Sequence, residues 1–256
     1  MKILIISKRS KKQNITLFAL ILIPILLITT FLGMRTFSVF SKEKAKLPIY
    51  CVDTKEKKVA ISFDSTWGVN NTIQILDILD KYNVKATFFL LGIWIDKYPE
   101  ETKAIHKRGH EIGNHSNSHP DMLHISSEKI VQEIAIVDAK LMKLIETDTK
   151  LFRFPSGAYN SNSVAAAEKT NHYCIQWDVD SIDWKEQGAD IEYNRVIKKV
   201  NPGSIILFHN GAKYTPETLE RVIKELKSKG YEFVKVSDLI YKDNYYIDNT
   251  GKQKLK

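Results

Sequence analysis

The chain has 256 residues, of which 43% are hydrophobic, and a formal net charge of +8. This length and apolar content suffice for one domain with a single buried core. The positive charge lies in residues 1–56, which hold ten Lys and Arg against three Asp and Glu, whereas residues 57–256 hold 28 against 27. A nearly neutral folded part has no cationic field to hold a phosphate backbone, so nucleic acid is excluded as a partner.

Residues 15–34 form an uncharged, mostly apolar run. At 1.5 Å per residue, a helix of this length spans about 30 Å, the thickness of a hydrocarbon core. The basic segment before it, residues 1–14, favours a cytoplasmic N-terminus. We therefore expect one transmembrane anchor in the cell membrane, a stalk at 35–56 and a domain outside the cytoplasm. A cleaved signal peptide is the alternative, although the apolar run exceeds a usual signal-peptide core.

From residue 57 onward, short apolar runs alternate with longer amphipathic ones, which is typical of βαβ units. The predicted strands are residues 59–63, 86–91, 111–113, 151–154, 173–177, 204–208 and 232–236. The predicted helices are residues 72–82, 100–107, 127–145, 163–169, 191–200 and 216–229. About seven such units predict an α/β domain, a distorted parallel (β/α) barrel over residues 57–242. The polar tail, residues 243–256, is expected to be loosely ordered.

Ionisable side chains stand at or just after the C-terminal ends of five predicted strands. They are Asp64, His115, His119, Arg153, Asp180, Asp183 and His209. In a parallel barrel these strand ends share one rim, where the βα loops build active sites. The sequence therefore predicts that these side chains meet in one site.

His115 and His119 are four residues apart. A single helical turn would place both imidazoles on one side, as zinc or another transition metal requires. Two capping or surface histidines in a loop are the alternative interpretation.

Residues 57–240 resemble the polysaccharide deacetylase family, the NodB-homology domain of carbohydrate esterase family 4. The resemblance rests on five motifs that occur in order, at residues 62–65, 115–119, 153–157, 180–184 and 207–209. Any one motif is weak, but five in order are specific. The resemblance implies a distorted (β/α) barrel that holds a divalent metal, zinc being expected and cobalt or manganese being the alternatives.

The resemblance also implies roles in catalysis. His115 and His119 would hold the metal, which polarises the acetamide carbonyl and activates a water. Asp64 would be the general base. His209 would be the acid that protonates the departing amine, oriented by Asp183, which raises its pKa.

Further residues are implied in substrate binding. Arg153 would pair with a catalytic carboxylate, and the backbone amide near Tyr159 would help to stabilise the oxyanion. Trp184 and Leu207 would form the slot for the acetyl methyl group, and Asp180 lies beside them in the fourth motif. The alternatives are that Trp184 and Leu207 are core residues and that Arg153 forms a surface ion pair of little energetic value.

The first motif departs from the family, which has two adjacent aspartates where this chain has Asp64 and Ser65. Ser65 stands at the usual position of the metal-binding carboxylate and is a much poorer ligand. We favour weaker metal binding by His115, His119 and waters, with Asp64 still the base. In the alternative, Asp64 binds the metal and another group takes the proton.

The sequence thus predicts a membrane-anchored hydrolase that removes N-acetyl groups from a cell-wall glycan. Peptidoglycan is the expected substrate because an outward-facing anchored domain meets the wall first; chitin-like oligomers and O-acetylated xylan are alternatives. A catalytically weak or inactive glycan-binding or sporulation protein is the rival interpretation, since the Asp-x-x-Trp-Gly run at residues 64–68 resembles sporulation-linked members of the family. A third interpretation is a membrane-tethered α/β domain whose motif matches arise by chance. The oligomeric state does not follow from the sequence.

Overall fold

The computed structural model describes Ile23, Pro24 and residues 45–256. The predicted transmembrane run, residues 15–34, lies outside the described residues except for Ile23 and Pro24. No helix within the described ranges combines the length and the apolar character needed to cross a membrane. The anchor therefore stays a prediction, and the fold below is that of the compact unit Lys46–Lys256.

One parallel sheet forms the centre of this unit, with strand order β6-β5-β4-β3-β2-β8-β7 and with β9 pairing β2 beside that path. The strands are β2 (Lys58–Ser65), β3 (Thr87–Leu90), β4 (Glu111–Asn114), β5 (Leu151–Phe152), β6 (Tyr173–Cys174), β7 (Val179–Asp180), β8 (Ile205–His209) and β9 (Glu232–Phe233). In the described part of the chain, β6 and β7 at the two ends of this order do not pair with each other. The predicted barrel is therefore an open half-barrel of parallel strands.

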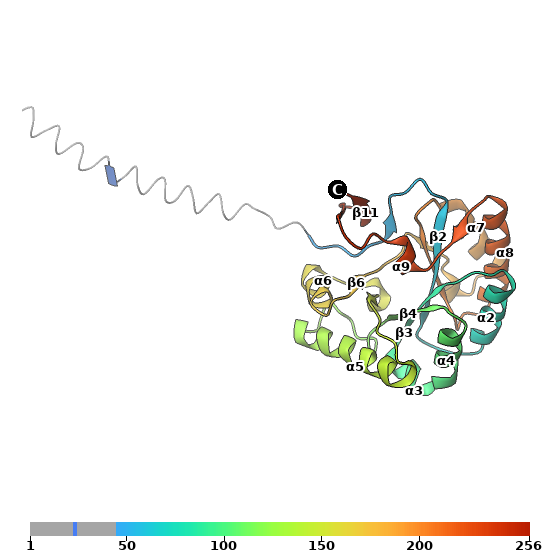
Figure 1. The fold of residues 1–256 in the computed structure, drawn as a ribbon, viewed down its shortest axis with the longest axis horizontal. Helices are drawn as coiled ribbons and strands as arrows, with labels where there is room; N and C mark the ends of the chain where they lie inside the picture. Colours follow the sequence, from blue (N-terminus) through green and yellow to red (C-terminus); the bar gives the residue numbers. More distant parts are fainter. Residues whose placement is uncertain (1–22, 25–44) are drawn as a thin grey trace, which may run out of the picture. The chain divides into compact units, whose positions relative to one another are not determined.

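The helices lie around the outside of the strands (Figure 1). They are α2 (Thr72–Lys81), α3 (Gly92–Lys97), α4 (Pro99–Lys107), α5 (Ser127–Ile145), α6 (Ser161–Glu168), α7 (Ala189–Lys199), α8 (Thr215–Ser228) and α9 (Val236–Leu239). All six predicted helices are present, with ends within two residues of the prediction. Ser126 caps α5 by accepting a hydrogen bond from the Lys129 amide at 3.2 Å, because this hydroxyl replaces a missing helical partner.

A cluster of phenylalanines fixes the register of the three central strands. The ring centroids of Phe63 and Phe88 are 4.7 Å apart, and those of Phe63 and Phe208 are 6.0 Å apart. All three side chains are fully buried, and a shift of one residue along any of these strands would turn a large ring to the opposite face of the sheet. This register pairs Asp64 at the end of β2 with His209 at the end of β8.

Residues 46–56 of the predicted stalk and the tail 243–256 belong to the domain. Ile49 and Val52, in the predicted stalk 35–56, are only 1% and 2% exposed. Strand β1 (Cys51–Val52) pairs with β11 (Lys252–Leu255), which pairs with β10 (Tyr245–Ile247). The tail 243–256 is therefore a small sheet and not a loose segment. The polar composition of the tail does not predict these strands, because β11 is ordered by backbone hydrogen bonds to β1, about 200 residues earlier in the chain.

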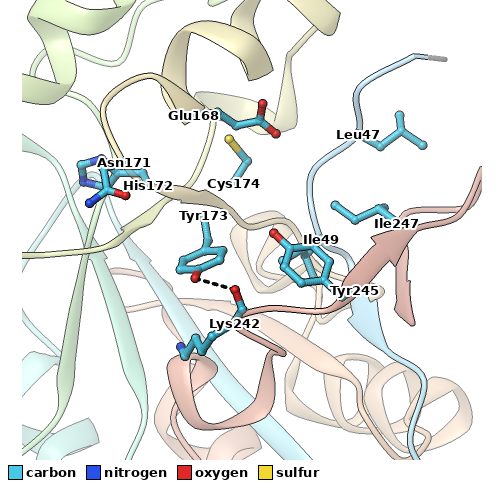
Figure 2. A pocket seen from close by; sticks show the side chains of 10 residues that line it. All are labelled: Leu47, Ile49, Glu168, Asn171, His172, Tyr173, Cys174, Lys242, Tyr245 and Ile247. Atoms are coloured by element: carbon cyan, nitrogen blue, oxygen red, sulfur yellow. Dashed lines mark hydrogen bonds between the residues drawn. The ribbon is translucent and has the colours of Figure 1, made fainter. Parts of the chain in front are cut away.

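A pocket of about 280 Å³ lies where these segments meet β6, and Figure 2 shows the side chains that line it. It is lined by Leu47, Ile49, Glu168, Asn171, His172, Tyr173, Cys174, Lys242, Tyr245 and Ile247. The Tyr173 hydroxyl donates to the Lys242 carbonyl oxygen at 3.0 Å, and Glu168 forms an ion pair with Lys46. Burial raises the pKa of the free Cys174 thiol, so this cysteine is a poor nucleophile.

Candidate active site

A cleft of about 380 Å³ opens at the C-terminal ends of the parallel strands. Its lining residues are Asp64, Thr66, Trp67, His115, His119, Ser156, Trp177, Asp180, Trp184, Leu207 and His209. The structure thus brings together in one place most of the ionisable residues that the sequence placed at strand ends, and Arg153 and Asp183 lie directly behind them.

Asp64 is held by a buried arginine. The Arg153 guanidinium is fully buried and donates to Asp64 Oδ1 at 2.8 Å, to Ser62 Oγ at 2.9 Å and to the Gln176 carbonyl at 3.1 Å. Burial alone would raise the pKa of Asp64, but the Arg153 charge, aided by nearby histidines, holds that pKa below its usual range. Asp64 is therefore ionised at neutral pH. The alternative prediction, that Arg153 forms an ion pair on the surface, is wrong because Arg153 is fully buried.

His115 is oriented by the backbone. Its Nδ1 lies 2.9 Å from the Arg153 carbonyl oxygen, which can only accept, so Nδ1 carries the proton. Its Nε2 lies 3.6 Å from Asp64 Oδ2. Burial lowers the pKa of His115 to about 4, so the imidazole is neutral at neutral pH. An imidazole lone pair facing a carboxylate is an arrangement that a cation between them would stabilise.

His119 reaches the cleft through a bend instead of the predicted helical turn. Ser116 and His119 both have left-handed backbone angles, with φ of 71° and 59°. The buried Glu133 of α5 supports this bend by accepting from the Ser118 amide at 2.8 Å and from its hydroxyl at 3.0 Å. The imidazole centroids of His115 and His119 are 5.2 Å apart. The two rings do lie together, but strained backbone held by tertiary contacts brings them there.

The side chains present do not complete a catalytic zinc site. Catalytic zinc takes three protein ligands, and the family's carboxylate position is Ser65 here. Ser65 is fully buried and its Oγ has no hydrogen-bond partner. Over Ile23, Pro24 and residues 45–256, no three His, Cys, Asp or Glu side chains form a group that could hold a metal ion. The donor set therefore fits weak binding by His115 and His119, with the Asp64 carboxylate 3.6 Å from His115 Nε2 as the alternative third ligand.

The pair of His209 and Asp183 is fully assembled. His209 Nδ1 lies 2.7 Å from Asp183 Oδ1, and Asp183 Oδ2 accepts from the His209 amide at 2.7 Å and from the Thr215 hydroxyl at 2.6 Å. With Nδ1 donating to the carboxylate, Nε2 is left for a ligand in the cleft. Burial would lower the pKa of His209, but the hydrogen bond and charge of Asp183 raise it above its ordinary value.

We expect the Asp183→Asn variant to lower the pKa of His209, because the carboxylate that favours the imidazolium is lost. Because the pKa of His209 is raised in the folded state, its pairing with Asp183 contributes fully to the stability of the fold below the ordinary histidine pKa of about 6.5. That contribution is lost as the pH rises through the pKa that His209 has in the folded protein. NMR titration of the imidazole measures the change. Asp180→Asn, which removes a weaker contributor, is the control and should lower the pKa less. An unchanged pKa in Asp183→Asn would contradict the assignment.

The predicted substrate-binding residues divide into two groups. Trp184 is 51% exposed and lines the cleft with Asp180 and the buried Leu207, so Trp184 is not a core residue. The Tyr159 hydroxyl instead lies 2.8 Å from the hydroxyl of Tyr50, and Tyr159 is not among the lining residues. The role of its backbone amide stays a prediction.

Ser156 lines the cleft from the third motif, in which Phe154 and Ser156 depart from the family's usual proline and aromatic residue. Three further lining residues had no predicted role: Thr66, Trp67 and Trp177. Trp67 is part of the Asp-x-x-Trp-Gly run, whereas Thr66 and Trp177 carry no chemical signal in the sequence, since threonine and tryptophan are common in any α/β domain. Only the convergence of the strand ends places them in the cleft.

Comparisons with known proteins agree with this geometry. A family model described as polysaccharide deacetylase matches residues 52–175. The peptidoglycan-N-acetylmuramic acid deacetylase PdaA of Bacillus subtilis is 31% identical over 196 residues, which cover 75% of this chain and 74% of PdaA.

Solved structures give the same result. BA3943 from Bacillus anthracis, described as a pseudoenzyme of carbohydrate esterase family 4, has 34% identity and a TM-score of 0.73, covering 75% of this chain and 68% of BA3943. A BA3943 mutant described as having restored enzymatic activity has 35% identity and the same TM-score of 0.73, covering 75% of this chain and 70% of the mutant. From these matches and the shared half-barrel, the chain belongs to the polysaccharide deacetylase family.

Proposed function

We propose that this chain recognises the N-acetylated glycan of peptidoglycan in the cleft between Asp64 and His209, and that it hydrolyses the acetamide weakly or not at all. The observation that carries this proposal is Ser65, which stands at the family's carboxylate position with a buried, unpartnered hydroxyl. The similarity to a described pseudoenzyme supports it.

The cleft has the chemistry of an acetamide-binding site. An acetamido group presents a small apolar methyl, a carbonyl acceptor and an N–H donor. Trp184 and Leu207 supply apolar surface for the methyl, while Asp64 can accept from the N–H and Nε2 of His209, in its protonated form, can donate to the carbonyl. Few polar groups fixed on rigid strands within an apolar cleft are what small-ligand sites require.

Hydrolysis needs more than these contacts. In this family a bound divalent metal polarises the carbonyl and generates the nucleophilic water. His115 and His119 would hold such an ion without the carboxylate that the family has at position 65, so we expect zinc to bind weakly and manganese or cobalt no better. Arg153 still holds Asp64 ionised, and Asp183 still orients the His209 imidazole by accepting from its Nδ1.

N-deacetylation itself is the second candidate function. The specific observation that favours it is that both pairs, Asp64 with Arg153 and His209 with Asp183, are assembled with short hydrogen bonds. A domain that only binds glycan has no need of an oriented acid and a buried, ionised base. The two candidates differ in turnover and agree on the ligand.

For the location, we propose that the run at residues 15–34 anchors the chain in a cell membrane with the domain outside the cytoplasm. The basic residues 1–14 and the uncharged run after them support this proposal. An anchored domain facing outward would meet cell-wall glycan directly. The link to sporulation stays a prediction from the Asp-x-x-Trp-Gly run.

The test is to titrate the full chain, in detergent, with N-acetylated chitotetraose and with its de-N-acetylated counterpart by calorimetry, and to measure acetate release with added zinc. We expect binding of the acetylated tetramer only, with little acetate formed. Equal binding of both tetramers would contradict an acetamide site. Rapid zinc-dependent acetate release would instead establish the second candidate.

A further inference from the structure

Trp67 lies directly against the imidazole of His209, the histidine that is hydrogen-bonded to Asp183. Its ring centroid is 4.8 Å from that of His209, with an interplanar angle of 27°, so the indole and the imidazole are stacked. Asp183 holds the same imidazole in its plane through Nδ1. His209 is thus held along its edge by Asp183 and on one face by Trp67.

The loop that carries Trp67 is held in place from both sides. The Trp94 indole donates to the Gly68 carbonyl at 2.8 Å, and the Asn71 amide donates to the Ala212 carbonyl at 2.7 Å. Gly211, two residues after His209, lies so close that a Cβ there would be 2.3 Å from the Trp67 carbonyl oxygen. Only glycine permits this approach of the two loops. The stacking is therefore a built feature and not a chance position of a surface side chain.

Trp67 is also 46% exposed, and it lines the cleft together with the 51% exposed Trp184. Large aromatic side chains left open at one cleft mark a binding surface, because exposing them offers no benefit to folding. Pyranose rings have apolar C–H faces of a size that matches an indole. The cleft therefore offers flat apolar surface for sugar rings next to the groups that face the acetamide.

We propose that Trp67 is a specificity-determining residue: its indole fixes the plane of the His209 imidazole and stacks its exposed part against a pyranose ring of the glycan. This inference rests on the proposed function, since it assumes an N-acetylated glycan in the cleft. It makes Trp67 a positioning residue for His209 and a selector of extended oligosaccharides over single sugars, because the stacked ring adds to the contacts of the acetamide.

The experiment compares Trp67→Leu and Trp67→Phe with the wild-type full chain. Leucine keeps an apolar side chain but has no ring, while phenylalanine keeps a ring that can stack. We expect Trp67→Leu to bind N-acetylated chitotetraose roughly tenfold or more weakly, as when an aromatic anchor is removed, and Trp67→Phe to keep most of the affinity. Affinity for the N-acetylglucosamine monomer should change much less.

NMR of the His209 imidazole protons gives the second readout. In the wild type these protons lie under the indole and should be shifted upfield by its ring current; Trp67→Leu should lose that shift. If Trp67→Leu binds the tetramer as tightly as the wild type, or leaves the imidazole signals unchanged, the inference is overturned while the proposed function stands. If the wild type itself binds no N-acetylated glycan, the proposed function fails first.

Discussion

The Ser65→Asp variant is expected to bind zinc at least roughly 100-fold more tightly than the wild-type chain, since even outer-shell partners of metal ligands are worth 10–100-fold. The reason is that a carboxylate would add the third, anionic donor to the two imidazoles. Ser65 is the last residue of β2, and the next strand links it to His115: Ser65 pairs with Leu90, whose carbonyl accepts from the His115 amide at 3.0 Å.

The same variant should release acetate from N-acetylated oligosaccharides in the presence of zinc, because the base and the acid are already assembled. Calorimetric zinc titration and an acetate assay measure the two effects. Ser65→Asn is the matched control: it has the shape of aspartate without its charge, and it should change neither quantity much. A Ser65→Asp protein that folds but gains no zinc affinity would show that the histidines do not form a metal site.

The Arg153→Met variant is expected to lose about 3–5 kcal/mol of unfolding free energy, the usual cost of breaking a buried ion pair by removing one partner. Methionine keeps much of the volume and the contact with Phe89, over whose ring the guanidinium lies at 4.0 Å. What is lost is the charge opposite Asp64 and the donors to Ser62 Oγ and the Gln176 carbonyl. Urea unfolding followed by circular dichroism gives the number.

A double variant separates the ion pair from the packing. Adding Asp64→Asn to Arg153→Met removes the unpaired buried carboxylate, so the double variant should be less destabilised than the sum of the two single ones. Arg153→Lys keeps the charge but cannot reach all three acceptors, and it should fall between the wild type and Arg153→Met. A loss below about 1 kcal/mol in Arg153→Met would mean that the pair behaves like an exposed one.

Much of the fold was predictable because its signals are local. The helices α2, α4, α5, α6, α7 and α8 each show apolar residues at helical spacing, and their ends were found within two residues. The short elements α3, β7 and α9 were missed, since two to six residues carry too little periodicity to be recognised. The tail strands β10 and β11 were missed for a different reason: β11 pairs with β1, which is distant in the chain, and β10 pairs with β11.

For the site, residue identity was enough to predict which chemical groups are available. The motif order identified Asp64, His115, His119, Arg153, Asp180, Asp183, Trp184, Leu207 and His209, and it showed that Ser65 replaces a carboxylate. Residue types determine which protons and lone pairs a site can offer, so chemical capacity can be read without coordinates.

The arrangement of those groups could be seen only in the folded chain. It showed that Arg153 is buried against Asp64, that His115 is oriented by a carbonyl from another strand, and that Trp67 stacks on His209. Each of these contacts joins residues 38 or more positions apart, and no periodicity or local spacing encodes such a distance. They follow from the register of the parallel strands, which the packing of Phe63, Phe88 and Phe208 fixes for β2, β3 and β8.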